Sequence, residues 1–152
     1  IIIHTSTSHG PSYNKRYPSE FEKFTPVCTT VEMSKADKGE LINSYDNSIL
    51  YTDYILDQVI GQLKELPEWR SCMMYISDHG ESLGEGGLYM HGVPIAISPR
   101  EQLEIPFIVW TSDTSLKIKD MEVYKQYHVF HSVMNFLGAR SEIYDETMNI
   151  FE

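Results

Sequence analysis

The sequence predicts an α/β fold in which helices cover a mixed, mostly parallel sheet. Residues 1–3 are β-branched and predict a short strand. Residues 72–76 are almost continuously apolar, as in a strand buried on both faces. Between them lies a long segment with helical periodicity, so the three pieces predict a β-α-β unit with a right-handed crossover. Residues 105–110, IPFIVW, predict a further strand.

The segment from 38 to 65 is the clearest predicted helix. Asp37 is a good N-cap, and Glu40 stands at the capping-box spacing from it. Pro67 closes the segment. Its apolar residues recur at three- and four-residue steps and give one apolar face: Leu41, Tyr45, Ile49, Leu56, Val59, Ile60 and Leu63. A second helix is predicted at 122–137, with Gly138 in the position that follows a helix end.

Composition limits the class of protein. The 152 residues suit a single domain, and 41% apolar content supplies a core. A net charge of −10 excludes a nucleic-acid footprint, which needs clustered Lys and Arg. Cys28 and Cys72 do not make a disulfide framework; free thiols are favoured, and a bridge between the two remains the alternative.

The chemistry concentrates after the strand at 72–76. Asp78 and His79 follow it directly, and Gly80 lets the chain bend there so that both side chains converge. A carboxylate and a neutral imidazole are ordinary ligands of zinc and similar metals. The sequence therefore predicts a metal site at this strand end. The alternative is a strand-end turn in which Asp78 caps the next segment and His79 is exposed.

Two long irregular segments carry the other candidates. Long loops in compact domains are usually functional, so their histidines and charged residues are candidate site residues. His9 lies in the first, and His91 lies in the second beyond a glycine-rich stretch. Taken alone, each is a loop histidine of undecided role. For Glu81 a solvated carboxylate is favoured over a metal ligand or a partner of a histidine. Lys15 and Arg16 are either an anion-binding pair or solvated.

Several motifs resemble bacterial phosphoethanolamine transferases, which modify lipid A or lipopolysaccharide core and include the mobile colistin-resistance enzymes. The motifs are SDHGESLGE at 77–85, HG at 91–92 and SHGP at 8–11, together with RYP at 16–18 and FTPVC at 24–28. The resemblance covers residues 1–110 and is weak beyond them. It implies an alkaline phosphatase/sulfatase-like α/β/α sandwich, of which residues 1–152 would be the C-terminal portion of a single catalytic domain.

The resemblance also implies a chemistry. Asp78 and His79 resemble that family's catalytic zinc ligands. His9 and His91 resemble the histidines that contact the phosphoethanolamine group or hold a second zinc. The expected donor is phosphatidylethanolamine, the acceptor is lipid A or lipopolysaccharide core, and the intermediate is a phosphothreonine. The family's nucleophilic threonine and transmembrane helices precede the segment that matches, so the parent is expected in the bacterial inner membrane, with this part in the periplasm.

Two alternatives remain open. SDHGE is shared more widely than the HGVP loop, so a sulfatase or phosphatase-type hydrolase of the same superfamily is the first. A non-catalytic domain with a structural metal is the second; it predicts a closed four-ligand site, whereas a catalytic metal keeps one position open.

Overall fold

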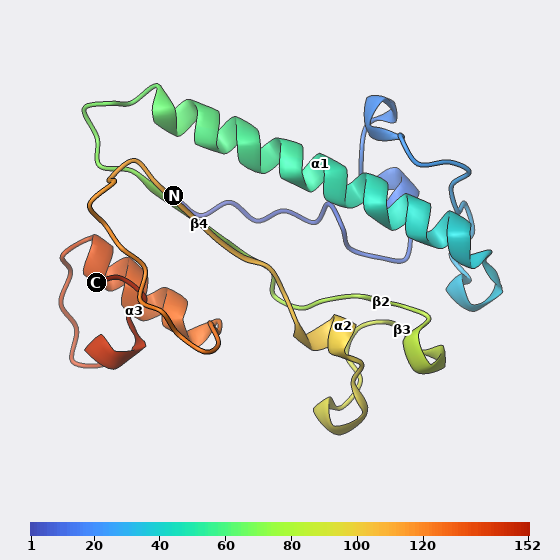
Figure 1. The fold of residues 1–152 in the computed structure, drawn as a ribbon. Coiled ribbons are helices and arrows are strands. Elements are labelled where there is room, and N and C mark those ends of the chain that lie inside the picture. Colours follow the sequence, from blue (N-terminus) through green and yellow to red (C-terminus); the bar gives the residue numbers. More distant parts are fainter. The chain divides into compact units, whose positions relative to one another are not determined.

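A computed structural model describes all 152 residues, which form two compact units. The first unit comprises residues 1–62 and 79–105, and the second comprises 63–78 and 106–152. Most of helix α1 (Lys38–Lys64) belongs to the first unit, and helix α3 (Tyr127–Phe136) belongs to the second (Figure 1). The expectation of a single catalytic domain stays a prediction.

Helix α1 confirms the predicted helix at 38–65. The backbone N–H of Glu40 donates to Asp37 Oδ1 at 3.1 Å, which is the capping contact that the spacing predicts. Leu41 is buried in the core of the first unit, beside Tyr13, Cys28 and Met33. Helix α1 thus supplies the surface on which the preceding segment packs.

The segment before α1 is irregular, with three short 3-10 turns, η1 (Tyr13–Lys15), η2 (Ser19–Phe21) and η3 (Met33–Lys35). Asn47 of α1, which is fully buried, holds this segment in place. Its Oδ1 accepts the backbone N–H groups of Lys23 at 2.8 Å and Phe24 at 2.9 Å. Its Nδ2 donates to the carbonyl of Phe24 at 2.9 Å and to the Tyr17 hydroxyl at 3.3 Å. One side chain therefore satisfies backbone groups that no ladder pairs.

The rest of the first unit is a small antiparallel hairpin and a short helix. Strand β2 (Ser82–Leu83) pairs with β3 (Tyr89–Met90), and the two lie side by side in Figure 1. Helix α2 (Arg100–Leu103) follows them after another 3-10 turn.

The second unit contains strand β1 (Cys72–Ile76), which has the predicted bounds, and strand β4 (Phe107–Thr111). Helix α3 ends at Phe136, and Gly138 takes the predicted position after the helix end in a Schellman motif: Ala139 N–H donates to Met134 O and Gly138 N–H to Asn135 O, both at 2.9 Å. The C-terminal residues pack on α3, where Ser132 Oγ accepts the N–H of the fully buried Ile150 at 3.0 Å.

The α/β class is confirmed, but the strand pairing differs from expectation. Strands β1 and β4 are antiparallel, with Met74 opposite Val109, and β2–β3 is antiparallel as well. The parallel part of the expected sheet is therefore not formed by these strands. Apolar content reports burial and carries no information about strand direction, and most residues of β1 are only half-buried.

Three boundaries differ from the sequence predictions. Residues 1–3 form no strand and no β-α-β unit, because no neighbouring strand pairs their backbone groups. Strand β4 starts two residues later than the predicted 105–110. Helix α3 starts at Tyr127 instead of 122, because Lys125 N–H donates to His128 Nδ1 and the Tyr124 hydroxyl donates to Lys119 O, contacts that hold a turn there.

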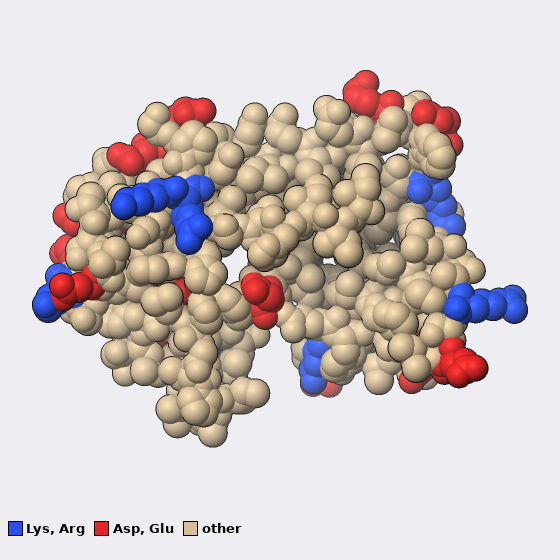
Figure 2. Space-filling view, turned by 180° about the vertical axis from the view of Figure 1, so that it is seen from behind, with Lys and Arg blue, Asp and Glu red and all other residues tan.

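Both cysteines are free, which confirms the expectation for Cys72 and leaves no bridge between the two; Cys28 is buried and its thiol donates to the carbonyl of Thr30. On the face shown in Figure 2, Lys and Arg side chains are dispersed among uncharged residues. No helix combines the length and the apolarity that crossing a bilayer requires.

Candidate functional site

Gly80 fixes the start of the site against α2. Its backbone N–H donates to the carbonyl of Gln102 at 3.0 Å, and a Cβ placed on it would lie 1.9 Å from the carbonyl oxygen of Glu101. Only glycine fits so close to another backbone. The buried Gln102 also donates to Ser82 Oγ at 2.9 Å, so both sides of Glu81 are tied to α2.

Three histidines of the first unit converge at this point: His9, His79 and His91. The rings of His79 and His91 stack with centroids 3.6 Å apart, and His9 meets them edge-on at 5.8 and 5.1 Å. The loops before α1 and after β1 thus contribute to one cluster, which the sequence alone left undecided.

Hydrogen bonds set the tautomer of each ring. His9 Nδ1 lies 2.7 Å from the carbonyl oxygen of Gly10, and His79 Nδ1 lies 3.0 Å from that of Gly80. His91 Nδ1 lies 3.1 Å from Glu81 Oε1. Carbonyl and carboxylate oxygens only accept, so Nδ1 carries the proton in every neutral ring. The lone pair of each ring is therefore on Nε2.

These residues fit a metal ion. One ring nitrogen from each of the three histidines lies within 4.8 Å of the others. Metal-bound histidines usually donate their second ring N–H to a carbonyl or carboxylate, and all three rings do so here. Imidazole nitrogens suit zinc as well as copper, iron and nickel, so the cluster does not select the metal by itself.

Glu81 is not the solvated carboxylate that the sequence favoured. Its side chain is 5% exposed. Oε2 accepts the Tyr13 hydroxyl at 3.0 Å, and Oε1 lies 3.4 Å from the Gly10 amide nitrogen in addition to its contact with His91. Tyr13 could not be identified as part of the site from the sequence, because 68 residues separate it from Glu81 and no spacing rule links them.

Asp78 is the last residue of the second unit's first segment, two residues after the end of β1 and directly before His79. The Gln126 side chain donates to its backbone carbonyl at 2.7 Å and to that of Ser77 at 2.9 Å, which anchors this stretch within the second unit. The predicted pairing of Asp78 and His79 on one ion stays a prediction.

Arg16 and the two histidines of α3 make hydrogen bonds with the backbone outside the cluster. Arg16 Nε donates to the carbonyl of His9 at 3.2 Å, so its guanidinium supports the loop that carries this histidine. His128 and His131 of α3 accept backbone N–H groups from Lys125 and Asp145. Burial lowers the pKa of His128, which favours the neutral ring that accepts this bond.

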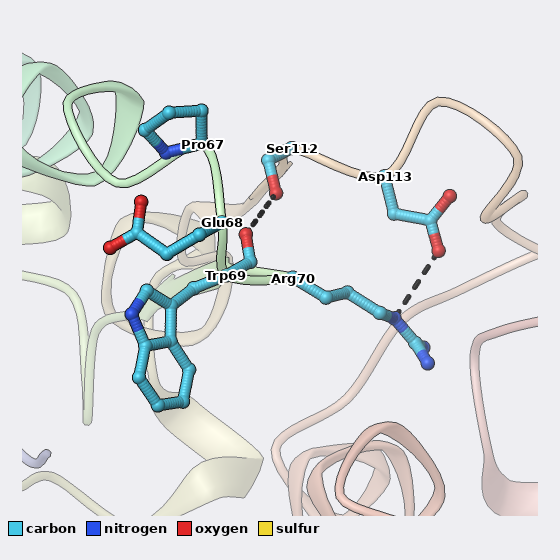
Figure 3. A pocket seen from close by; sticks show the side chains of 6 residues that line it. All are labelled: Pro67, Glu68, Trp69, Arg70, Ser112 and Asp113. Carbon is cyan, nitrogen blue, oxygen red and sulfur yellow. Dashed lines mark hydrogen bonds and ion pairs between the residues drawn. The ribbon is translucent and has the colours of Figure 1, made fainter.

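The second unit has a shallow pocket beside the loop before β1, shown in Figure 3. Arg70 Nε donates to Asp113 Oδ2 at 3.2 Å, and its guanidinium lies over the Phe136 ring. Hydrogen bonds from Ser115 hold the pKa of Asp113 below its ordinary value. These charges are already paired, so the pocket offers no cluster comparable to the histidines. Its lining residues are Pro67, Glu68, Trp69, Arg70, Ser112 and Asp113.

Comparisons with known sequences and structures show which proteins this chain resembles. A model of the sulfatase family matches residues 1–139. The phosphoethanolamine transferase EptA of Escherichia coli K12 is 38% identical over 164 residues, covering 100% of this chain and 30% of EptA. The phosphatidylethanolamine transferase Mcr-1 of Escherichia coli is 47% identical over 112 residues, covering 73% of this chain and 21% of Mcr-1.

Two solved structures share the fold. The C-terminal periplasmic domain of the phosphoethanolamine transferase EptC from Campylobacter jejuni superposes with a TM-score of 0.83 at 44% identity, over 94% of this chain and 48% of that one. The soluble domain of lipooligosaccharide phosphoethanolamine transferase A from Neisseria meningitidis gives 0.87 at 37% identity, over 95% and 47%. The chain thus spans about 30% of full-length EptA and about half of each solved domain.

Proposed function

Because the chain belongs to the sulfatase family, we propose that it is part of the catalytic domain of a phosphoethanolamine transferase. The observation that carries the proposal is the cluster of His9, His79 and His91, with Nε2 as the lone-pair nitrogen of each. EptA of Escherichia coli K12 supports it, since its match covers the whole chain and therefore the segments that bring the cluster together.

The proposed reaction moves phosphoethanolamine from phosphatidylethanolamine to lipid A or lipopolysaccharide core. In the first step a threonine outside these residues forms an O–P bond, the bond from phosphorus to the diacylglycerol oxygen breaks, and diacylglycerol leaves with a proton. In the second step an acceptor oxygen forms the new bond to phosphorus and gives up its proton, the bond from phosphorus to the threonine oxygen breaks, and the released threonine takes up a proton.

We assign Asp78 and His79 as ligands of a zinc ion, which when bound supplies Lewis-acid polarisation of the phosphoryl group. Of the three clustered histidines, only His79 is assigned to the metal; His9 and His91 line the substrate side, where their Nε2 atoms are available for proton transfer. A neutral imidazole with its lone pair on Nε2 accepts a proton from an attacking hydroxyl, and the resulting imidazolium returns it to a leaving oxygen. The carbonyl of Gly10 and the carboxylate of Glu81 stay bonded to Nδ1–H throughout, so the rings keep their orientation.

The parent protein is proposed to be anchored in the bacterial inner membrane, with this domain in the periplasm. Both substrates are membrane lipids, which agrees with such a location. The solved EptC structure, which is that of a C-terminal periplasmic domain, supports this assignment.

Transfer by the full-length protein tests the proposal. Lipid A incubated with the protein and phosphatidylethanolamine should gain one phosphoethanolamine group by mass spectrometry. His9→Ala and His91→Ala should each lower the rate by about 100-fold or more, the usual contribution of proton transfer by a positioned side chain. His131→Ala, a histidine of α3 with only local contacts, is the matched control.

Metal dependence is measured in the same assay. A chelator should abolish transfer, and zinc should restore it better than magnesium. Release of phosphoethanolamine into water without any acceptor would instead identify a hydrolase. Metal binding without turnover in either assay would identify a structural metal domain, and both results overturn the proposal.

A further inference from the structure

Glu81 joins the two segments that carry His9 and His91. Its Oε1 lies 3.1 Å from His91 Nδ1 and 3.4 Å from the Gly10 amide nitrogen, and its Oε2 accepts the Tyr13 hydroxyl at 3.0 Å. Gly10 in turn accepts the Nδ1 proton of His9 through its carbonyl. One residue, Gly10, therefore lies between the carboxylate and the hydrogen bond that orients His9, whereas the carboxylate contacts the ring of His91 directly.

The environment keeps these contacts in place. A buried carboxylate is costly unless donors satisfy it, and Glu81 has three donors from two segments. Burial, followed by the charge of Glu81, raises the pKa of Tyr13, so that phenol stays protonated and donates at every physiological pH. The hydroxyl of Tyr13 is itself buried with the rest of its ring, so water does not compete for the contact.

We propose that Glu81 is a positioning residue: its carboxylate holds His91 in the Nδ1–H tautomer and fixes the loop of His9, so that both rings present Nε2 to the same reacting group. The expected effect of Glu81 on the reaction rate rests on the proposed transferase function. The tautomer of His91 is a property of the protein itself and holds for any activity of this site.

The kinetic arm uses Glu81→Gln in the full-length protein. The amide keeps the size of the side chain and loses the charge and one of the two accepting oxygens. We expect kcat to fall by about 10- to 100-fold, as is usual for partners that orient a functional histidine. KM for phosphatidylethanolamine should change by less than about threefold, because the misoriented ring matters most in the transition state.

Glu85→Gln is the matched control. Glu85 lies in the same loop, and its Oε2 accepts the backbone N–H of Leu83 without a contact to the three rings. Its kcat and KM should stay near the wild-type values. Equal losses in both variants would mean that Glu81 only stabilises the loop, and a wild-type kcat in Glu81→Gln would overturn the proposal.

The spectroscopic arm is independent of turnover. In protein labelled with ¹⁵N-histidine and free of added metal, the His91 signals, identified by their loss in His91→Ala, should show a protonated Nδ1. Glu81→Gln should increase the share of the Nε2–H tautomer, and an unchanged share contradicts the proposal. If wild type transfers nothing, the proposed function fails while this arm still decides the role of Glu81. If Glu81→Gln does not fold, the same kinetic and ¹⁵N-histidine measurements are made on Glu81→Asp, which retracts the carboxylate by one methylene.

Discussion

At the scale of single residues, Gly80 and Tyr13 decide how the loops of the site are held. Gly80 lies where the chain passes directly against the backbone of α2, and Tyr13 brings a hydroxyl to the buried Glu81 carboxylate. The first contact depends on steric fit, and the second is a hydrogen bond to a charged carboxylate. Each can be changed without touching a histidine.

Gly80→Ala should destabilise the domain, because the added Cβ would lie 1.9 Å from the carbonyl oxygen of Glu101 and the backbone must move. We expect a loss of about 1–3 kcal/mol, the usual cost of overpacking, measured by thermal unfolding. Gly61→Ala is the control, since nothing lies within 4 Å of its Cβ position on α1. It should stabilise the domain by about 0.5–1 kcal/mol. Equal stability of the two variants would contradict the close approach.

Tyr13→Phe should change how stability depends on pH. Burial and the charge of Glu81 raise the pKa of Tyr13 in the folded state. Such a group stabilises the fold fully below about pH 10, where the unfolded phenol is still protonated, and this contribution is lost as pH rises through the folded pKa. The wild-type free energy of unfolding should therefore fall in the alkaline range more steeply than that of Tyr13→Phe.

Denaturant titrations from pH 7 to above pH 10 measure this difference. At pH 7 the variant should be less stable by about 1.5–3 kcal/mol, the worth of a hydrogen bond to a charged group. Tyr54→Phe, at an exposed tyrosine of α1, removes a hydroxyl of the same kind outside the core and serves as the control. Parallel alkaline curves for wild type and Tyr13→Phe would contradict the buried contact.

At the scale of elements, α1 acts as the support for the irregular segment before it. Asn47 makes four hydrogen bonds to three residues of that segment, and Ser44 Oγ accepts the N–H of Cys28 at 2.8 Å. The segment therefore takes its shape from polar side chains on one face of the helix.

Asn47→Ala should loosen this segment, because it leaves the N–H groups of Lys23 and Phe24 without the acceptor that the buried Asn47 side chain supplies. We expect a loss of about 1–3 kcal/mol in the free energy of unfolding, measured by denaturant titration. Faster proteolysis within residues 18–26 should accompany it. Asp57→Ala, on the exposed side of the same helix, should change neither quantity.

The sequence was a good guide where the signal is local. The bounds of α1 and β1 follow from periodicity, capping and turn residues within a few positions of each element. Strand direction, the absence of a strand at residues 1–3 and the later start of α3 depend on partners elsewhere in the chain. In the site, resemblance and loop placement indicated that His9, His79 and His91 belong together. The burial of Glu81 beside Tyr13 could not be predicted, because it is a contact across 68 residues.

At the scale of the whole molecule, the chain corresponds to one part of its longer relatives. It covers 30% of EptA and about half of the solved domains, and the proposed nucleophile lies outside it. The histidine cluster, by contrast, is complete within the first unit. Residues 1–152 should therefore contain the histidines that can bind a metal and yet turn over no substrate.

Residues 1–152 produced alone should show no transfer of phosphoethanolamine and no hydrolysis of a phosphoethanolamine ester, whereas the full-length protein should show transfer. Mass spectrometry should detect no product from residues 1–152, because no threonine among them is assigned as the nucleophile. Circular dichroism of the shorter chain, compared with the 27 residues of α1 that the structure contains, checks that it is folded. Turnover by residues 1–152 would place the nucleophile within them.

The support that α1 gives to the first segment also has a consequence for the order of assembly during synthesis. The contact of Phe24 with Asn47 closes a loop of 23 residues, whereas that of Tyr13 with Glu81 spans 68. Closing the longer loop costs about 1 kcal/mol more in chain entropy, and its second partner is translated later. The segment that carries His9 should therefore pack on α1 first, and its contacts with Glu81 and His91 should form later.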